Sequence, residues 1–387
     1  MEHPPYSAQR SGRRSGLRVL HVALATSGLF AAGCTVRRPP ASVADVPPCT
    51  ADPTLGDDAL SVMWILRDDP DERSALDAYC WGVGPIEFVA GAMASGVPAL
   101  DSLAVISWNS YIGTGQLDSL ITDLRTGRLT GQPVHHYVLL LQEMHRAGEV
   151  VPTGLPSWVS VGQPGGDMER PNRRDVAAVA GRHGLWLFYA PSMRTGRSDD
   201  GQVEDRGNAI LSTLPLQSPL AIELPFERQR RIAVAAHVYG RSTDGQPWSL
   251  RLVSAHLDNR TRLGRIYRSL GAGRTRQAEA LAQHLADHEP TVLGADLNTW
   301  LGGAGAGAVR ALRDVLPLPA HVPGGGTSPL PGPLPDLRLD YLMFRLPDGW
   351  AADYRVLAGT YGSDHRPLLG WVHTSTLAVD SLPSTAR

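Results

Sequence analysis

The stretch 292–300 joins an apolar run to two polar side chains that could do chemistry. The run ends at small residues, after which Asp296 and Asn298 follow two positions apart. Residues two apart in an extended chain point to the same side, so this carboxylate and this carboxamide are expected to project together from a strand end. Open α/β sheets place ligand sites at such ends. An Asx turn that ends the strand is the structural alternative, and the rest of the chain decides between them.

Polar side chains next to apolar runs recur along the chain. Apolar runs or the loops between them carry further acids, amides and imidazoles: Asn109, Glu143, Asn208, His256, Asp340, Asp364 and His365. A single Asp or His at a strand end is more often a hydrogen-bonded structural group, but capping does not explain so many. The chain has only five Asn, and three of them belong to this set. Such side chains bind divalent ions and phosphate groups and move protons.

Strands and helices that alternate along the chain must position these residues. Apolar runs predict strands at 103–109, 137–143, 185–190, 207–212, 231–239, 248–256, 292–296, 337–344 and 368–372. Helical spacing of apolar residues predicts helices at 116–125 and 274–288. Segments rich in Gly, Pro or polar residues predict loops at 152–175, 194–206 and 301–335. The alternation indicates an α/β fold.

The N-terminal part reads as an export signal followed by a tether. Residues 1–33 combine a basic start with an apolar run and small residues before Cys34, as in a bacterial lipobox, so Cys34 is the expected lipidation site. Residues 34–58 are rich in Pro and predict an extended tether, and 59–100 predict a small helical segment. We expect the protein to be exported to the cell envelope or beyond and held at the membrane by this lipid. Export also makes a disulfide between Cys49 and Cys80 plausible, with two free thiols as the alternative.

Composition excludes several classes of protein. With 42% hydrophobic and 19% charged residues the chain is a globular protein and not a disordered one. All 36 basic residues are Arg, a bias that makes Arg abundance weak evidence for nucleic-acid binding. Removal of residues 1–33 takes away four Arg and one Glu and moves the formal net charge from −2 to −5. No overall basic field therefore exists to hold nucleic acid.

The ordered set of motifs in 101–373 resembles the endonuclease/exonuclease/phosphatase superfamily. The matching pieces are Ser107-Trp108-Asn109, Leu141-Gln142-Glu143, Gly207–Ser212, Ser254–Leu257, Gly294–Asn298, Leu339–Tyr341 and Ser363–Pro367. The resemblance implies a four-layer α/β sandwich of two mixed β-sheets flanked by helices, as in deoxyribonucleases, with residues 374–387 as a tail. It also implies a monomeric hydrolase of phosphate esters that uses Mg²⁺, with Mn²⁺ or Ca²⁺ as alternatives.

The resemblance assigns roles to these residues. Glu143 is the implied principal metal ligand, assisted by Asn109 and Asp364. Asp340 and His365 form the implied dyad. Either His365 or Asp296 is the base, and we favour Asp296 at the water with His365 on the phosphate. Asn298 and His256 are implied donors to the transition state, or His256 is the acid at the leaving oxygen. Substrate contacts are expected from Asn208, Arg206 and Arg231.

The sequence departs from the family where the substrate would be recognised. Ala295 stands where the family usually has Gly, and Leu257-Asp258-Asn259 matches neither the sphingomyelinase nor the inositol-phosphatase pattern. The stretch 259–276 holds six Arg and no acid, which indicates either a surface that steers phosphates or a solvated helix face. A nuclease-like phosphodiesterase is the first expectation. A phospholipid or inositol-phosphate phosphoesterase is the alternative, and a non-catalytic binding protein is the rival from another class.

Overall fold

The computed structural model describes residues 48–50, 54–55, 58–59, 61–92, 98–154, 173–197, 202–259, 271–300 and 306–374. The chain separates into the units Met1–Asp45 and Val46–Arg387, and the second is described here. The export signal, Cys34 and most of the tether lie outside the described residues, as does the tail after 374. Among the described residues, no helix is long and apolar enough to cross a membrane.

One sheet has seven strands. Their order is β14 (Ala351–Val356), β15 (Leu368–His373), β5 (Ser102–Asn109), β6 (Tyr137–Ala147), β8 (Val203–Ser212), β7 (Trp186–Arg197) and β4 (Glu87–Val89). Strands β5 and β6 are parallel, and their neighbours run antiparallel. Both faces of β5 are buried over nearly its whole length, which explains why it reads as a continuous apolar run.

The other sheet has six strands. Their order is β13 (Asp340–Arg345), β12 (Thr291–Asp296), β11 (Pro247–His256), β10 (Ile232–Arg241), β9 (Gln217–Glu223) and β3 (Met63–Ile65). Strands β11 and β12 are parallel, so their polar last residues, His256 and Asp296, lie side by side in register. Asp296 is also in register with Asp340 at the start of the antiparallel β13.

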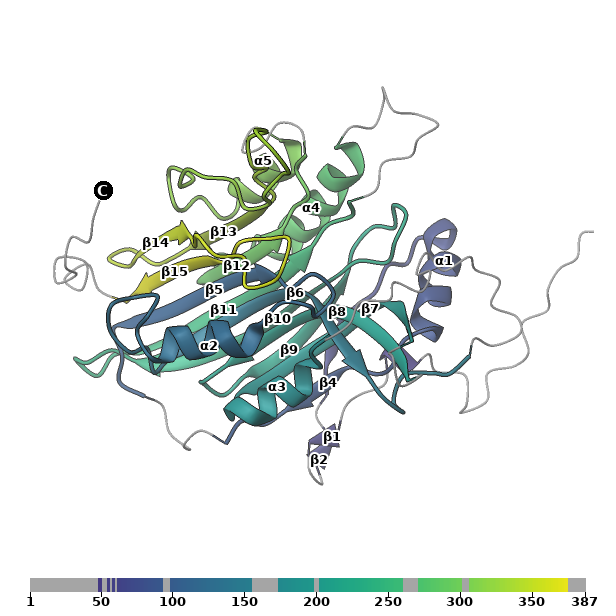
Figure 1. Ribbon diagram of the computed structural model, residues 1–387, viewed down its shortest axis with the longest axis horizontal. Coiled ribbons are helices and arrows are strands. Elements are labelled where there is room, and N and C mark those ends of the chain that lie inside the picture. Colours follow the sequence, from purple (N-terminus) through teal and green to yellow (C-terminus); the bar gives the residue numbers. More distant parts are fainter. Residues whose placement is uncertain are drawn as a thin grey trace, which may run out of the picture. The chain divides into compact units, whose positions relative to one another are not determined.

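The two sheets pack face to face with helices on both outer sides (Figure 1). One apolar core lies between the sheets. A second core packs α2 (Leu117–Arg125) and α3 (Val176–His183) on the seven-stranded sheet, and a third packs α4 (Ala272–His284) and α5 (Gly307–Arg313) on the six-stranded sheet. Helix α2 shows why: its buried residues Leu117, Leu120, Ile121 and Leu124 form one apolar stripe. The predicted four-layer sandwich is confirmed.

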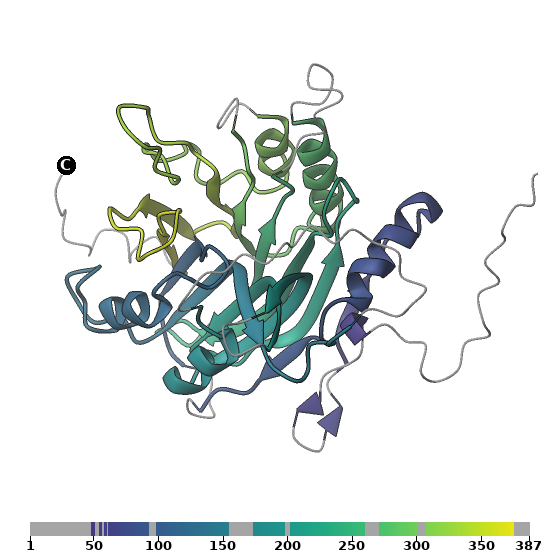
Figure 2. The same ribbon diagram turned by 45° about the vertical axis from the view of Figure 1, so that its right-hand side comes forward.

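The segment 59–100 is not the helical segment that its apolar spacing suggested. Among the described residues of this segment only α1 (Pro70–Trp81) is helical, while β3 pairs in parallel with β9 and β4 pairs with β7. Each strand has three residues, too few for a period of two to be read from sequence. The segment thus gives each sheet an edge strand, so the sandwich begins before residue 101 (Figure 2). Short pieces precede it: the turn η2 (Pro48–Thr50), and β1 (Thr54–Leu55) paired with β2 (Asp58–Ala59).

A disulfide joins Cys49 in η2 to Cys80 in α1, with 5.2 Å between the two Cα atoms. This is the expected pairing. It fastens the beginning of the described chain to α1, and Val83 packs against it.

Two predicted loops contain regular structure. In 194–206, β7 continues through Arg197 and β8 starts at Val203, because bulges accommodate the glycines and buried ion pairs hold the polar residues. The segment 301–335 contains α5 and the fully buried Thr327. Strands β9 and β14 and helix α3 were not predicted.

Candidate active site

Asp296 is the centre of a buried polar cluster at the ends of the inner strands. Its Oδ2 accepts a hydrogen bond from Asn109 Nδ2 at 2.9 Å and lies 3.3 Å from His256 Nε2 and 3.9 Å from His365 Nε2. Its Oδ1 accepts the backbone N–H of Asn298 at 2.9 Å. Burial, and then the charge of Asp340, raise the pKa of Asp296 to about 7. This carboxylate can therefore exchange a proton near neutral pH.

The Asx turn, which was the structural alternative for Asp296 and Asn298, is present. The bond from the Asn298 N–H to Asp296 Oδ1 closes an Asx turn, and Asn298 has a positive φ of 50°. The same turn aims the Asn298 carboxamide at His256, whose Nε2 lies 2.9 Å from Asn298 Nδ2. Since an amide nitrogen can only donate, His256 Nε2 accepts and its proton is on Nδ1.

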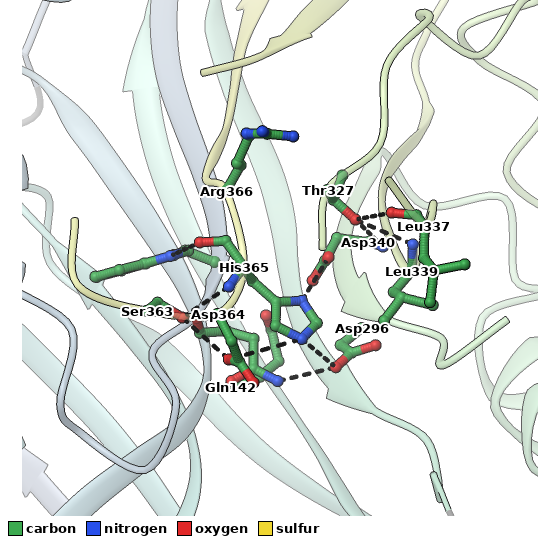
Figure 3. Close-up of polar contacts among 12 residues, drawn as sticks. Gln142, Asp296, Thr327, Leu337, Leu339, Asp340, Ser363, Asp364, His365 and Arg366 are labelled. Atoms are coloured by element: carbon green, nitrogen blue, oxygen red, sulfur yellow. Dashed lines mark hydrogen bonds and ion pairs between the residues drawn. The ribbon is translucent and has the colours of Figure 1, made fainter. Parts of the chain in front are cut away.

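The predicted dyad of Asp340 and His365 is present (Figure 3). Asp340 Oδ2 lies 2.7 Å from His365 Nδ1, and the other ring nitrogen faces Asp296. Burial lowers the pKa of His365, but Asp340 and then Asp296 outweigh this effect and raise it to about 10. His365 is therefore an imidazolium at neutral pH, which favours contact with a phosphate over action as a base.

His256 has the opposite character. Burial, followed by the positive charges of Arg231 and Arg206, holds the pKa of His256 well below its usual value. A neutral imidazole with its proton on Nδ1 is a hydrogen-bond donor. This favours the expected donor role over that of an acid that must first be protonated.

Glu143 lies at a β-bulge in β6, where the pairing with β8 shifts between Leu141 and Met144. Its φ is 52°, a left-handed conformation that a non-glycine residue adopts only under constraint from its surroundings. The bulge turns Glu143 out of the regular alternation of the strand. Its carboxylate is partly exposed, and His256 Nδ1 at 3.9 Å is its nearest ion-pair partner among the described residues.

Two sets of residues could hold a metal ion. The predicted set centres on Glu143, whose carboxylate is a hard oxygen ligand that Mg²⁺ accepts. Asn109 has its amide engaged with Asp296 and with the Tyr111 N–H, and Asp364 lies at the surface, 4.0 Å from His365 Nε2. The second set is Asp296, Asp340 and His365, whose ligand atoms lie within 4.8 Å of one another. Because His365 Nδ1 is committed to Asp340, the oxygen ligand Glu143 fits Mg²⁺ better.

Arg206, Arg231 and Asn208 line a pocket together with Glu143 and His256. Asn208 is buried, and its Nδ2 donates to the Ile232 carbonyl at 2.6 Å. Arg231 is only 3% exposed, donates to Gln229 Oε1 at 3.0 Å and forms no ion pair among the described residues. A buried cation without a carboxylate partner is costly, so an anion at the mouth of this small pocket, of about 10 Å³, would stabilise Arg231.

The arginines of the stretch 259–276 that the structure describes lie in two different environments. Arg276 pairs with Glu227 and Glu72, which supports the solvated-face interpretation for it. Arg274 is buried, and burial lowers its pKa while the charges of Asp258 and Asp296 oppose this effect. The arginines at 260, 262, 265 and 268 lie outside the described residues.

Several residues that support the site were missed from sequence. Thr327 Oγ1 accepts the backbone N–H groups of Leu339 and Asp340 and so fixes the start of β13. Ser363 Oγ donates to the Asn109 carbonyl at 2.7 Å and accepts the His365 N–H. Gln142 Nε2 contacts Ser254 and Gly294 across the two sheets. For Gln142 and Ser363 the only sequence signal was their position beside Glu143 and Asp364.

Comparison with known proteins identifies relatives in fold alone. No protein-family model matches the chain, and no curated protein matches it. The similar solved structures include an endonuclease/exonuclease/phosphatase from Beutenbergia cavernae DSM 12333 (TM-score 0.47, 17% identity, 74% of each chain). They also include the human Nocturnin catalytic domain with bound sulfate (0.40, 16%, 71% of this chain and 96% of that one) and the 3'-5' exonuclease NExo from Neisseria meningitidis (0.41, 15%, 70% and 98%).

A ferrous NO complex of Cimex nitrophorin is among the matches as well. Likeness at this level therefore concerns the sandwich and leaves the chemistry to be argued from the site. The two-sheet sandwich that the sequence resemblance implied is the fold observed here.

Proposed function

We propose that the protein is a divalent-metal-dependent phosphoesterase that hydrolyses a phosphodiester by direct attack of water. The observation that supports this most is the arrangement around Asp296. A carboxylate with a pKa of about 7, an imidazolium and a neutral imidazole donor surround one point, beside the buried Arg231, which has no ion-pair partner in the described part of the chain. Hydrolysis of a phosphate ester needs these groups: a base for water, and donors for the charge of the transition state.

Each residue has a role that its contacts allow. Asp296 accepts the proton of the attacking water, and Asn109 orients it through the bond to Oδ2. Asp340 keeps His365 protonated, so that His365 Nε2–H contacts a phosphoryl oxygen. Asn298 holds the tautomer of His256 that presents Nδ1–H to the pocket.

Two further parts complete the proposal. Arg231 and Arg206 receive the non-bridging phosphate oxygens in the pocket that also contains Glu143. Glu143, with Asn109 and Asp364, would hold Mg²⁺, which supplies charge neutralisation at the phosphate and an acidified water. Asp296 would then act on a water already made more acidic.

A nuclease-like diesterase is the first substrate class, and an inositol-phosphate or phospholipid phosphoesterase is the second. We further propose that the protein is exported and lipid-anchored at Cys34. The support for export is the sequence of residues 1–34 alone.

The test is a substrate panel. Purified residues 35–387 would be assayed on plasmid DNA, sphingomyelin, phosphoinositides and bis(p-nitrophenyl) phosphate, with Mg²⁺ and with EDTA. We expect metal-dependent turnover of at least one, and a loss of at least ~10²-fold in rate for Glu143→Ala and for His365→Ala. Glu149→Ala and His321→Ala, at exposed positions, are the matched controls. Turnover of none of the substrates would favour the non-catalytic binding protein.

A further inference from the structure

A pocket next to the active site lies between the first turn of α4 and helix α5. It has a volume of about 410 Å³, within the range of ligand-binding pockets. Six of its lining residues matter here: Gly271, Arg274, Thr275, Thr299, Gly307 and Arg310. We call it the α4/α5 pocket. Thr299 directly follows Asn298, so the pocket borders the end of β12 that carries the proposed catalytic residues.

Arg274 is the notable residue of the α4/α5 pocket. It is only 7% exposed, and among the described residues its guanidinium has neither a hydrogen bond nor an ion pair. Burial lowers the pKa of Arg274; the charges of Asp258 and Asp296 oppose this effect, but among the described residues neither carboxylate forms a hydrogen bond or ion pair with the guanidinium. A guanidinium that is largely buried and has no direct partner is costly. It is a group that an incoming anion would stabilise.

The start of α4 adds to this preference. Its N-cap is Gly271, which has a φ of 89° and offers no side chain to cap the first-turn N–H groups. Such a terminus attracts negative charge. Glu227 packs against Gly273 in the same turn, but it pairs with Arg276 and is not among the residues that line the pocket. Within the α4/α5 pocket no described acidic side chain competes for Arg274.

We propose that the α4/α5 pocket binds a second phosphate group of the substrate, apart from the phosphate that is hydrolysed. The inference rests on the proposed function, because it treats the pocket as an extension of the site around Asp296. It selects among the substrate classes. A nucleic-acid strand and an inositol polyphosphate each carry a second phosphate, whereas sphingomyelin has one phosphate and a cationic head group that Arg274 would repel.

The first test measures anion binding without catalysis. Inorganic pyrophosphate would be titrated by calorimetry, in EDTA, into the wild type, Arg274→Gln and Arg231→Met. We expect Arg231→Met to retain a binding component that Arg274→Gln weakens by at least tenfold. Arg276→Gln, on the same helix but already paired with Glu227, is the control and should bind as the wild type does. Equal affinity of Arg274→Gln and the wild type would overturn the proposal.

The second test concerns the substrate. For pTpT against TpT, and for inositol 1,4-bisphosphate against inositol 1-phosphate, the wild type should show a lower KM for the member of one pair with the second phosphate. Arg274→Gln should remove at least tenfold of that preference and leave kcat within about threefold. A preference unchanged in Arg274→Gln, or absent from both pairs, would contradict the assignment. If no diester is hydrolysed, the proposed function fails, and the pyrophosphate titration still decides whether the pocket binds anions.

Discussion

Replacement of Arg231 by Met should weaken catalysis and strengthen the fold at the same time. Arg231 is 3% exposed; among the described residues its guanidinium has no ion-pair partner and donates one side-chain hydrogen bond, to Gln229. Burial of a charge costs several kcal/mol in proteins. Against this, the variant loses one hydrogen bond of about 1 kcal/mol and some attraction to Glu143 in the same pocket. We therefore expect the free energy of unfolding to rise by about 1–2 kcal/mol.

The neighbouring Arg230 provides the matched control. It is fully buried as well, but its Nε lies 2.8 Å from Glu223 Oε1, and both side chains are 0% exposed. Arg230→Met would leave the buried Glu223 carboxylate with Arg73 as its remaining partner, 2.7 Å away, so we expect a loss below the about 3–5 kcal/mol of a fully unpaired charge but still a loss of stability. Urea denaturation at pH 7 measures whether the free energy of unfolding rises in Arg231→Met and falls in Arg230→Met. The rate of bis(p-nitrophenyl) phosphate hydrolysis should fall at least ~10²-fold in Arg231→Met. A loss of stability in Arg231→Met as large as that in Arg230→Met would refute the inference that the unpaired Arg231 destabilises the fold when no anion is bound.

Three further predictions follow from the same contacts. Asp296→Asn should raise the free energy of unfolding at pH 8 but not at pH 4. Burial raises the pKa of Asp296 from its ordinary value of 3.8 to about 7 in the folded state, so the cost of ionisation, on the order of 4 kcal/mol, is absent below pH 4 and complete above pH 7. Denaturation at the two pH values checks this, and an equal effect at both would exclude it. Asp340→Asn should lower the pKa of His365 from about 10 toward 6.5, as measured by the NMR shift of its ring protons; an unchanged titration would show that the dyad does not set that pKa. Reduction of Cys49–Cys80 should lower the free energy of unfolding by about 3–4 kcal/mol in denaturant titrations with and without a phosphine, whereas no change would mean that the link leaves the unfolded chain unconstrained.

The sequence predicted the site better than the edges of the sheets, for a physical reason. Residues such as Asn109, Asp296 and Asp340 end or begin long strands that are buried on both faces, and those strands have clear apolar patterns. The tertiary structure then brings their ends together because β11, β12 and β13 are neighbours in register. Strand β3 could not be found in this way, since its three residues are held by pairing with β9, more than 150 positions away.

The sequence also could not predict which arginines form buried ion pairs. Arg230 and Arg231 are adjacent and chemically identical, yet one has a buried carboxylate partner and the other has none among the described residues. Which of them meets Glu223 depends on the alternation of side chains in β10 and the turn before it, and on the position of β9. Thr327 was missed because it lies in a segment rich in Gly and Pro, whose order comes from its contacts with Leu339 and Asp340.

The most direct test of the central claim compares Asp296→Asn with the wild type in the hydrolysis of a phosphodiester. We expect the wild type to hydrolyse bis(p-nitrophenyl) phosphate in Mg²⁺ with a rate that falls below about pH 7, as Asp296 becomes protonated. We expect Asp296→Asn, at least as stable as the wild type at pH 8, to lose at least ~10³-fold in rate. A stably folded Asp296→Asn variant that retains the wild-type rate and pH dependence would contradict it.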